Sequence, residues 1–383
     1  MGNNTQEKNN FCFTIPEQNR GWILDAICHE IARFSPEECA FVYYPCESLP
    51  SAKTYFLAHF SLLQKCLKEF PNLEDRQIFV WFTHPPKGSD LDARTIATLR
   101  KASKIICTNT QSTQALSDQG IPLEQVTCVL GGADPSIFLP HPRSQGAVGF
   151  STAYYPRKAP DRILEIVRAM PHRQFLLLGR GWETYEHFAE LTSLENFTYV
   201  ETEYEHYPDY YNQLDVFVSP SYLEGGPIPL IETMMCNVVP VASNTGFAPD
   251  LIRHGENGFI FDVDSPVEAI CSLVDAAFSL DTDIRSTVID YTWEKFSGQI
   301  QTLQLERLGE LENKVKQLRI TLGQAIEESG RNKHKLQTTR EKLETTRDEY
   351  KAVRRELDQL RGSKLWLLWQ RYLALRRFLG FGR

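Results

Sequence analysis

Short hydrophobic segments alternate with amphipathic helical segments over residues 11–135. The expected strands are FCFTI (11–15), FVYYP (41–45), QIFVWFTH (77–84), KIICTN (104–109) and VTCVLGG (126–132). Helices are predicted between them, one of them over about 52–69. Apolar runs of this length that alternate with helices are typical of a parallel sheet covered on both faces. The pattern therefore predicts a doubly wound α/β domain over 11–135, after a polar, disordered N-terminus (1–10).

The same alternation starts again after a proline-containing linker at residues 134–147. The expected strands are VGFST (148–152), QFLLLG (174–179), FTYVET (197–202), DVFVSP (215–220), VVPVAS (238–243) and GFIFD (258–262). These predict a second doubly wound domain over 148–300. We expect the two domains to face each other across a cleft, because ligands of this fold class bind at the carboxyl ends of the strands.

From about residue 301 the strand signals end and a seven-residue hydrophobic repeat begins. The repeat keeps one register from Leu308 to Leu360, although its middle is polar and contains Gly323 and Gly330. Heptads sustained over this length predict a coiled coil at 301–361, through which the chain would form a homo-oligomer. The alternative is a long solvated helix that folds back on the body of the protein.

The last segment, residues 362–383, is basic and aromatic. It predicts an amphipathic helix that lies on an anionic membrane surface, and packing on a partner protein is the alternative. The apolar stretch from Leu365 to Leu379 is shorter than the ~18 residues that a membrane-spanning helix needs.

Charge is unevenly distributed along the chain. The net charge is −8, but residues 1–300 carry 22 basic and 38 acidic side chains, whereas residues 361–383 carry six basic and none acidic. An acidic body argues against nucleic acid as a partner.

The nine cysteines are scattered without a CxxC pair, which predicts free thiols in a reducing compartment. With no secretory signal at the N-terminus, we expect a cytoplasmic protein, peripheral at the inner face of a membrane.

The candidate chemistry lies in VSPSYLEGGPIPLIETMMCNVVPVAS (218–243). A strand ends near Ser219, and a turn of small residues from Glu224 to Pro227 opens a helix. Free N–H groups at a helix start bind anions, and glycines allow a ligand to approach the backbone. Glu224 and Glu232 bracket this helix start with seven residues between them. That arrangement suits a nucleotide sugar, which carries hydroxyl groups on both sides of its phosphates.

This segment resembles the E-x7-E signature of retaining glycosyltransferases of the GT-B fold, family-4 type. The segments 103–138, 153–170, 244–261 and 291–299 are similar to further parts of that family in the same order. The resemblance implies two Rossmann-like domains and sugar transfer without a metal or other cofactor. The N-terminal domain would hold the acceptor and the C-terminal domain the nucleotide sugar.

The resemblance also implies roles for individual residues. Glu224 and His84 would lie at the reacting sugar as catalytic residues. Glu232 would hold the ribose, and Lys158 the diphosphate. The remaining residues at the donor are backbone contacts from the turn: Gly225, Gly226 and Pro227. The acceptor-side loop would be Asn19, Arg20 and Gly21.

One position departs from the family pattern. The family usually has an arginine five residues before the lysine, where this chain has Ala153. Arg157 or Arg180 is the candidate replacement. The cationic side chains matter because, without a metal, they must stabilise the departing diphosphate.

The sequence as a whole therefore predicts a retaining, hexosyltransferase-like glycosyltransferase. Its acceptor would be a glycan or a lipid-linked molecule, in the synthesis of a surface polysaccharide or glycoconjugate. One alternative is a catalytically silent GT-B scaffold that organises partners at a membrane, which Ala153 favours. Another is a related enzyme of the same fold, such as a nucleotide-sugar epimerase.

Overall fold

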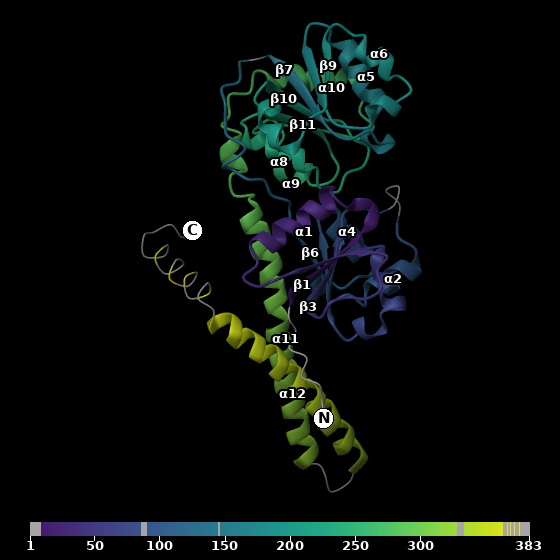
Figure 1. Cartoon of the computed structure of the whole chain (residues 1–383), viewed down its shortest axis with the longest axis vertical. Coiled ribbons are helices and arrows are strands. Elements are labelled where there is room, and N and C mark those ends of the chain that lie inside the picture. Colours follow the sequence, from purple (N-terminus) through teal and green to yellow (C-terminus); the bar gives the residue numbers. More distant parts are fainter. Residues whose placement is uncertain are drawn as a thin grey trace. The chain divides into compact units, whose positions relative to one another are not determined.

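The computed structural model describes residues 9–85, 90–144, 146–327 and 333–362, and four positions beyond them. The chain divides into two compact units (Figure 1). The first comprises Met1–Arg33 and Cys39–Ser297, and the second Phe34–Glu38 and Gly298–Arg383. The first unit contains both predicted α/β domains.

The N-terminal domain is built on a six-stranded parallel sheet of order β2-β1-β3-β4-β5-β6. Its strands are β1 (Asn9–Pro16), β2 (Ala40–Tyr44), β3 (Ala52–Leu57), β4 (Gln77–Phe82), β5 (Lys104–Cys107) and β6 (Val126–Cys128). Its helices are α1 (Ile23–Arg33), α2 (Leu62–Glu69), α3 (Ala93–Leu99) and α4 (Thr110–Asp118). Side chains on both faces of β1, β3 and β4 are buried, as the continuous apolar runs indicate.

Two expectations for this domain were wrong. The helix expected over about 52–69 is a strand, β3, followed by the separate helix α2. The run AKTYFL is buried along nearly its whole length between β1 and β4, which favours an extended backbone. β1 begins at Asn9 and the side chain of Asn10 is buried, so the ordered domain starts within the segment predicted to be disordered.

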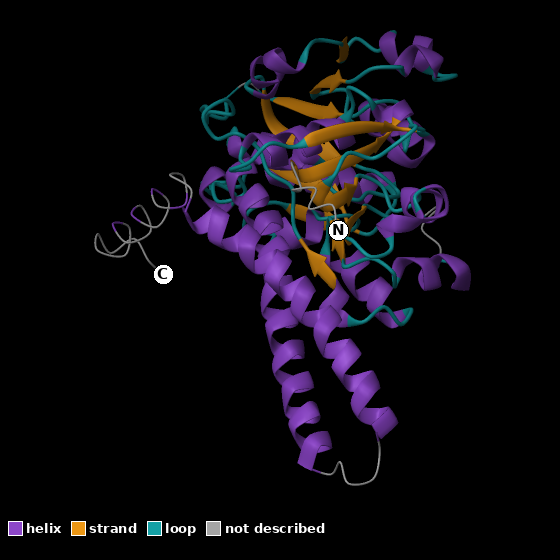
Figure 2. Cartoon of the chain, turned by 60° about the horizontal axis from the view of Figure 1, so that its bottom comes forward, coloured by secondary structure: helices purple, strands orange, loops and turns teal. Residues whose placement is uncertain are grey.

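The C-terminal domain contains a second six-stranded parallel sheet, of order β12-β11-β10-β7-β8-β9. Its strands are β7 (Ala147–Ser151), β8 (Gln174–Leu178), β9 (Phe197–Val200), β10 (Leu214–Ser219), β11 (Val239–Ser243) and β12 (Phe259–Phe261). Its helices are α5 (Pro160–Ala169), α6 (Phe188–Thr192), α7 (Tyr207–Tyr211), α8 (Ile228–Met235), α9 (Ala248–Leu251) and α10 (Val267–Ala277). Helices surround the strands, as Figure 2 shows. The doubly wound fold predicted for both domains is confirmed.

The two domains of the first unit touch at the carboxyl ends of their strands. The Asn109 amide, just after β5, donates a hydrogen bond to the Gly225 carbonyl, just after β10, at 2.8 Å. The last residues of the first unit also contact the N-terminal domain. Phe296 packs on Trp81 with ring centroids 5.5 Å apart, and the Ser297 hydroxyl donates to the Ile31 carbonyl at 2.9 Å. The sequence analysis assigns these residues to the end of the C-terminal domain. In the structure, the helix that begins at Trp293 packs with its first turns on the N-terminal domain.

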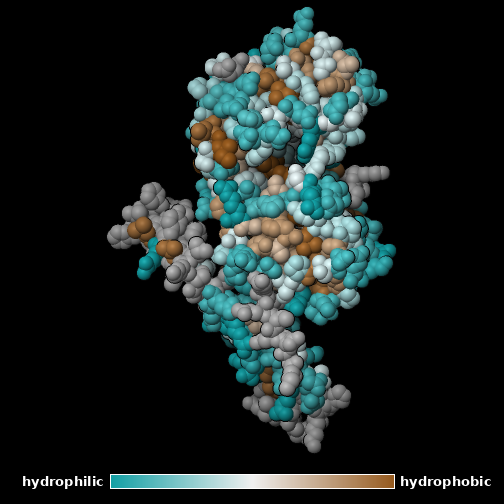
Figure 3. All heavy atoms as spheres, in the orientation of Figure 1, coloured by the Kyte–Doolittle hydropathy of each residue, from teal (hydrophilic) through white to brown (hydrophobic). Residues whose placement is uncertain are grey.

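The second unit is mainly helical. The seven-residue repeat lies on two helices, α11 (Trp293–Glu327) and α12 (Lys333–Gly362), which run side by side as a hairpin (Figures 1 and 2). The sequence analysis expects a coiled coil between copies of the chain here, with one long solvated helix as the alternative. Predicted seam positions with described side chains are less exposed than their neighbours, with Val315, Thr346 and Leu357 the most buried. On the face that Figure 3 shows, the described residues of the hairpin are largely hydrophilic.

Most of the C-terminal tail lies outside the described residues. Trp366, Leu368, Arg371 and Leu375 are described and helical, and Leu368 and Leu375 are exposed. None of the helices in the described part of the chain has the length and apolar character to cross a membrane. Binding of the tail to a membrane surface stays a prediction.

Candidate donor site

Glu224 is the centre of a buried polar network between β10 and α8. Its side chain is only 6% exposed. The Ser221 hydroxyl donates to Oε1 of Glu224 at 2.7 Å, and the Glu224 backbone N–H donates to the Thr245 hydroxyl at 3.1 Å. These contacts fix the carboxylate at the carboxyl end of the second sheet, where ligands of doubly wound domains bind.

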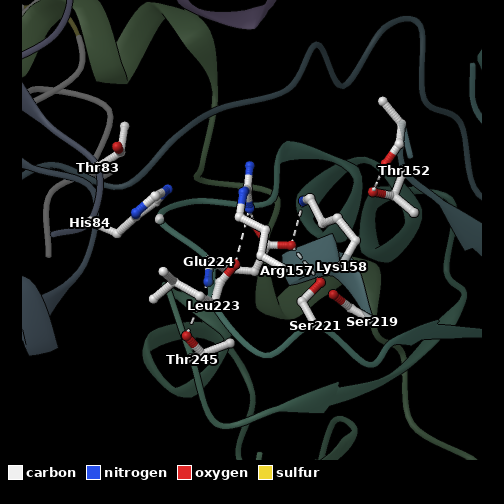
Figure 4. A network of polar contacts seen from close by, with 12 residues as sticks. Thr83, His84, Thr152, Arg157, Lys158, Ser219, Ser221, Leu223, Glu224 and Thr245 are labelled. Carbon is white, nitrogen blue, oxygen red and sulfur yellow. Dashed lines mark hydrogen bonds and ion pairs between the residues drawn. The ribbon is translucent and has the colours of Figure 1, made fainter. Parts of the chain in front are cut away.

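Two cations come to Glu224 from the short 3₁₀ turn Pro156–Lys158 that follows β7. The Lys158 ammonium donates to Oε1, and Nη1 of Arg157 lies 3.2 Å from Oε2. Figure 4 shows both side chains directed at the carboxylate. The turn ends at Ala159, which has a left-handed φ of 56°. The fold thus brings the two predicted donor-binding cations to the predicted catalytic carboxylate. In the sequence, Arg157 and Lys158 are 67 and 66 residues away from Glu224.

The environment keeps Glu224 charged. Burial alone would raise the pKa of Glu224, but the charges of Lys158 and Arg157 and the hydrogen bonds hold it below its usual value. Burial lowers the pKa of Lys158, and the carboxylate opposes that shift. A buried charge is tolerated only with a partner of opposite sign. The pair is therefore ionic near neutral pH.

His84 comes from the N-terminal domain, just after β4. Its Nδ1 lies 3.1 Å from the Pro85 carbonyl oxygen. Burial lowers the pKa of His84, and Arg157 and Lys158 add to this effect while Glu224 opposes it. The imidazole is therefore neutral near pH 7, within electrostatic range of the Glu224 network.

Glu232 lies inside α8 and is 1% exposed. The Tyr204 hydroxyl donates to its Oε1 at 2.6 Å, and the Tyr211 hydroxyl donates to Oε2 at 2.8 Å. Burial raises the pKa of Glu232 to about 7, although both hydrogen bonds act in the opposite direction. Tyr204 is about half exposed, so one of the two partners lies at the protein surface.

The glycines after Glu224 are required by the packing around them. A Cβ on Gly225 would lie 2.8 Å from Thr83 Cβ, and one on Gly226 would lie 2.7 Å from a ring carbon of Phe247. The backbone that leads to Pro227 and α8 therefore lies directly against the end of β4. The sequence analysis explains these glycines by the approach of a ligand, and the structure adds the close approach of the other domain.

The predicted acceptor-side loop follows β1. Arg20 is exposed, forms an ion pair with Glu17 at 2.9 Å and lies over the Tyr43 ring at 3.6 Å. The Gly21 N–H donates to Asp25 at 2.7 Å, and Asn19 ends a 3₁₀ turn. Within the described residues, no hydrogen bond or ion pair joins these three residues to the Glu224 network. Arg180, the other candidate cation, lies over the Trp22 ring of the same loop at 3.5 Å.

Several residues of the site were not found from the sequence. The missed side chains are Ser221, Thr245, Tyr204, Tyr211, Asn109 and Thr83. The tyrosine-rich run YEHYPDYY was the only signal available for two of them. Within the described ranges, no group of three or more His, Cys, Asp and Glu is arranged to hold a metal ion.

Residues 138–292 match the model of the family described as glycosyl transferases group 1. No curated protein matches the sequence significantly. Several solved structures share the fold. The structure of Anabaena HepE in complex with UDP has 14% identity and a TM-score of 0.61, and the match covers 77% of this chain and 98% of HepE.

Two further structures are similar to about the same degree. Sucrose-phosphate synthase from Thermosynechococcus elongatus has 15% identity and a TM-score of 0.63, with coverage of 79% and 100%. The lipopolysaccharide outer core galactosyltransferase WaaB has 11% identity and a TM-score of 0.62, with coverage of 78% and 99%. The fold is GT-B, and the match to the group 1 family model lies in the C-terminal domain.

Proposed function

We propose that this chain is a glycosyltransferase that moves a sugar from a nucleotide-diphosphate sugar to a glycan or lipid-linked acceptor, with retention and without a metal. The observation that carries the proposal is the buried, ionised Glu224 between Lys158 and Arg157 at the start of α8. A carboxylate beside two cations and a helix N-terminus provides contacts for sugar hydroxyls and for a diphosphate in one place.

Each charged group of the network has hydrogen-bonding sites left over for a nucleotide sugar. A carboxylate has about four acceptor sites, and Glu224 uses three of them in the described contacts. One site is therefore left for a sugar hydroxyl. Lys158 has three N–H donors and Arg157 five, and most of them are not used by Glu224. Arg157 also donates from Nη1 to the Leu223 carbonyl, and the remaining donors of both side chains would stabilise the charge that develops on the departing diphosphate.

Glu232 suits the ribose end of the donor. Its two oxygens accept hydrogen bonds from the hydroxyl groups of two tyrosines, and a ribose would also present hydroxyl groups as donors. Because Tyr204 is half exposed, a ribose hydroxyl can take its place on Oε1, while Tyr211 keeps Oε2 in position. The donor would then extend from Glu232 along the start of α8 to Glu224.

The acceptor side of the reaction belongs to the N-terminal domain. A neutral His84 can hydrogen-bond a sugar or acceptor hydroxyl without repelling the nearby cations. In the same-face mechanism that the family resemblance implies, a phosphate oxygen of the leaving group accepts the acceptor proton. Closure of the two domains would exclude water, which otherwise hydrolyses the donor.

A catalytically silent scaffold is the second candidate function. Ala153 stands where the family usually has a cation, and both Lys158 and Arg157 already contact Glu224. In this alternative the helical hairpin and the basic tail organise other proteins at a membrane. For either function, we propose that hairpins from two or more copies associate and that the tail holds the protein on an anionic membrane surface.

The proposal is tested by thermal denaturation of the full chain with UDP-, GDP- and ADP-sugars. UDP-glucose comes first because a HepE structure contains it. A ligand at a hundredfold excess over Kd stabilises the native state by about 2.7 kcal/mol, which shifts the melting temperature measurably. Stabilisation by one donor, lost in Glu232→Ala, is the expected result. No shift with any nucleotide sugar would contradict the proposal.

A further inference from the structure

A second arginine lies at the donor side of the C-terminal domain without an ionic partner. Arg180 follows β8 in a turn that ends at Gly181, which has a φ of +77°. Within the described ranges its guanidinium has no hydrogen-bond or ion-pair partner, in contrast to Arg157 and Lys158. The described contact of the guanidinium is with Trp22 of the N-terminal domain, whose ring centroid is 3.5 Å from Cζ.

The backbone places Arg180 directly beside the position where the family cation is missing. The Thr152 N–H donates to the Leu178 carbonyl at 2.8 Å, and the Tyr154 N–H donates to the Arg180 carbonyl at 3.0 Å. Ala153 lies between these two hydrogen bonds. The backbone of Arg180 therefore lies next to that of Ala153. The Arg180 side chain extends from a point beside the position where the side chain of an arginine at 153 would begin.

The surroundings tie Arg180 to the nucleotide end of the site. Burial raises the pKa of Tyr207 and Glu232 adds to this shift, while the charge of Arg180 opposes it. The Tyr207 ring packs on Tyr204 at 5.1 Å and on Tyr211 at 6.0 Å, and these two hold Glu232. Arg180 is thus within electrostatic range of the ring cluster beside the proposed ribose site.

Stacking on Trp22 leaves the guanidinium free to bind phosphate. A cation–π contact uses the flat face of the group, whereas its N–H donors point outward in the plane. The main chain of Trp22 is held by two hydrogen bonds, because its backbone N–H donates to the Asn19 carbonyl at 3.0 Å and its carbonyl accepts from the Ala26 N–H at 2.9 Å. The ring thereby restricts a long, exposed side chain that would otherwise sample many conformations.

We infer that Arg180 supplies the second cation for the donor diphosphate in place of the side chain missing at Ala153, and that Trp22 of the N-terminal domain positions it. The inference rests on the proposed function and adds Trp22 to it as a positioning residue. It also couples the two domains, since the charge that binds the diphosphate is oriented by the domain that carries the acceptor.

The test is calorimetric titration of the full chain with UDP, GDP and ADP, each compared with its monophosphate. Arg180→Ala should weaken nucleoside diphosphate binding roughly 10- to 100-fold and monophosphate binding far less, because a charge-assisted contact is lost. Trp22→Leu should weaken diphosphate binding about two- to fivefold, and it should have no further effect in Arg180→Ala. Trp22→Phe, which keeps a ring, and Ala153→Arg in the Arg180→Ala background should restore binding.

The chain offers a matched control on the same strand. Arg173 precedes β8 at its amino end, whereas Arg180 follows its carboxyl end, and Arg173 lies over the Phe278 ring at 3.9 Å. Phe278→Leu should leave diphosphate affinity unchanged. Wild-type affinity in Trp22→Leu, or equal losses for mono- and diphosphate in Arg180→Ala, would overturn the inference and leave the proposed function intact. A wild-type chain that binds none of the three nucleoside diphosphates would contradict the proposed function itself.

Discussion

Glu224 and Glu232 have similar burial but opposite surroundings. Glu224 is paired with two cations, and its pKa lies below the usual value. The partners of Glu232 among the described residues are two phenols, and its pKa is raised to about 7. One carboxylate is therefore charged at all ordinary pH values, whereas the other is close to half protonated at neutral pH. The spacing of the two residues predicts neither property, because both depend on side chains distant in the sequence.

This contrast predicts opposite effects of removing each charge. In the wild type, Glu232 takes up a proton more readily in the folded state, so stability falls as pH rises from about 4.5 to 7. Glu232→Gln should therefore gain melting temperature relative to wild type as pH rises through this range, and level off above it. Thermal denaturation from pH 5 to pH 8 measures the difference.

Glu224→Gln is the comparison variant. It leaves the buried Lys158 without its anionic partner, which typically costs ~3–5 kcal/mol, so it should melt below wild type at pH 7. A melting-temperature difference between Glu232→Gln and wild type that does not change with pH, or a Glu224→Gln variant as stable as wild type at pH 7, would contradict the assigned charge states.

At the scale of elements, the sequence predicted the strands with continuous apolar runs and both parallel sheets. It missed β3, because only four residues separate that strand from α2 and the two together resemble one helical segment. It predicted a coiled coil between copies of the chain and not the pairing of α11 with α12, since a heptad pattern does not distinguish a partner helix in the same chain from one in another. Contacts such as Asn109 with Gly225 depend on how the two domains meet, which local patterns do not encode.

The approach of β4 to the start of α8 predicts the effect of a single methyl group. In Gly225→Ala the new Cβ would lie 2.8 Å from Thr83 Cβ and 2.9 Å from the Thr83 carbonyl oxygen, so one element must move. We expect a loss of about 1–3 kcal/mol of stability, typical of overpacking, with weaker donor binding. Chemical denaturation measures the stability.

Gly298→Ala provides the control, because a Cβ there meets nothing within 4 Å and the residue lies inside α11. It should be neutral or stabilise the protein by up to about 1 kcal/mol. Equal stability of the two alanine variants would show that the close approach at Gly225 is not a constraint.

At the scale of the molecule, the first unit carries the proposed chemistry and the second unit the proposed assembly and membrane contact. The charge distribution supports this division, because residues 1–300 are acidic and the last residues are basic. An anionic membrane would repel the body at long range and attract the tail by ~1 kcal/mol per basic residue near the surface. The body would then be held at the membrane by its end alone.

A chain truncated after Glu306 tests the division. This cut keeps the buried Ile300 and Leu303 and removes most of the hairpin and the tail. The truncated chain should be monomeric by light scattering and should remain in solution with anionic liposomes. The full chain should be oligomeric and sediment with them, less so at high salt. A monomeric full chain that ignores liposomes at low salt would contradict both assignments and leave the donor site untouched.

The central claim is that Glu224 serves sugar transfer, and the most direct test is release of nucleoside diphosphate from the donor that the thermal screen identifies. The wild type should release it, slowly without acceptor. Glu224→Gln, assayed well below its melting temperature, should still bind that donor but release product roughly 100- to 1000-fold more slowly, as when one stabilising group is removed from a transition state. Equal rates would show that the reaction centre lies elsewhere, and a wild type that binds the donor without ever cleaving it would identify the chain as a scaffold.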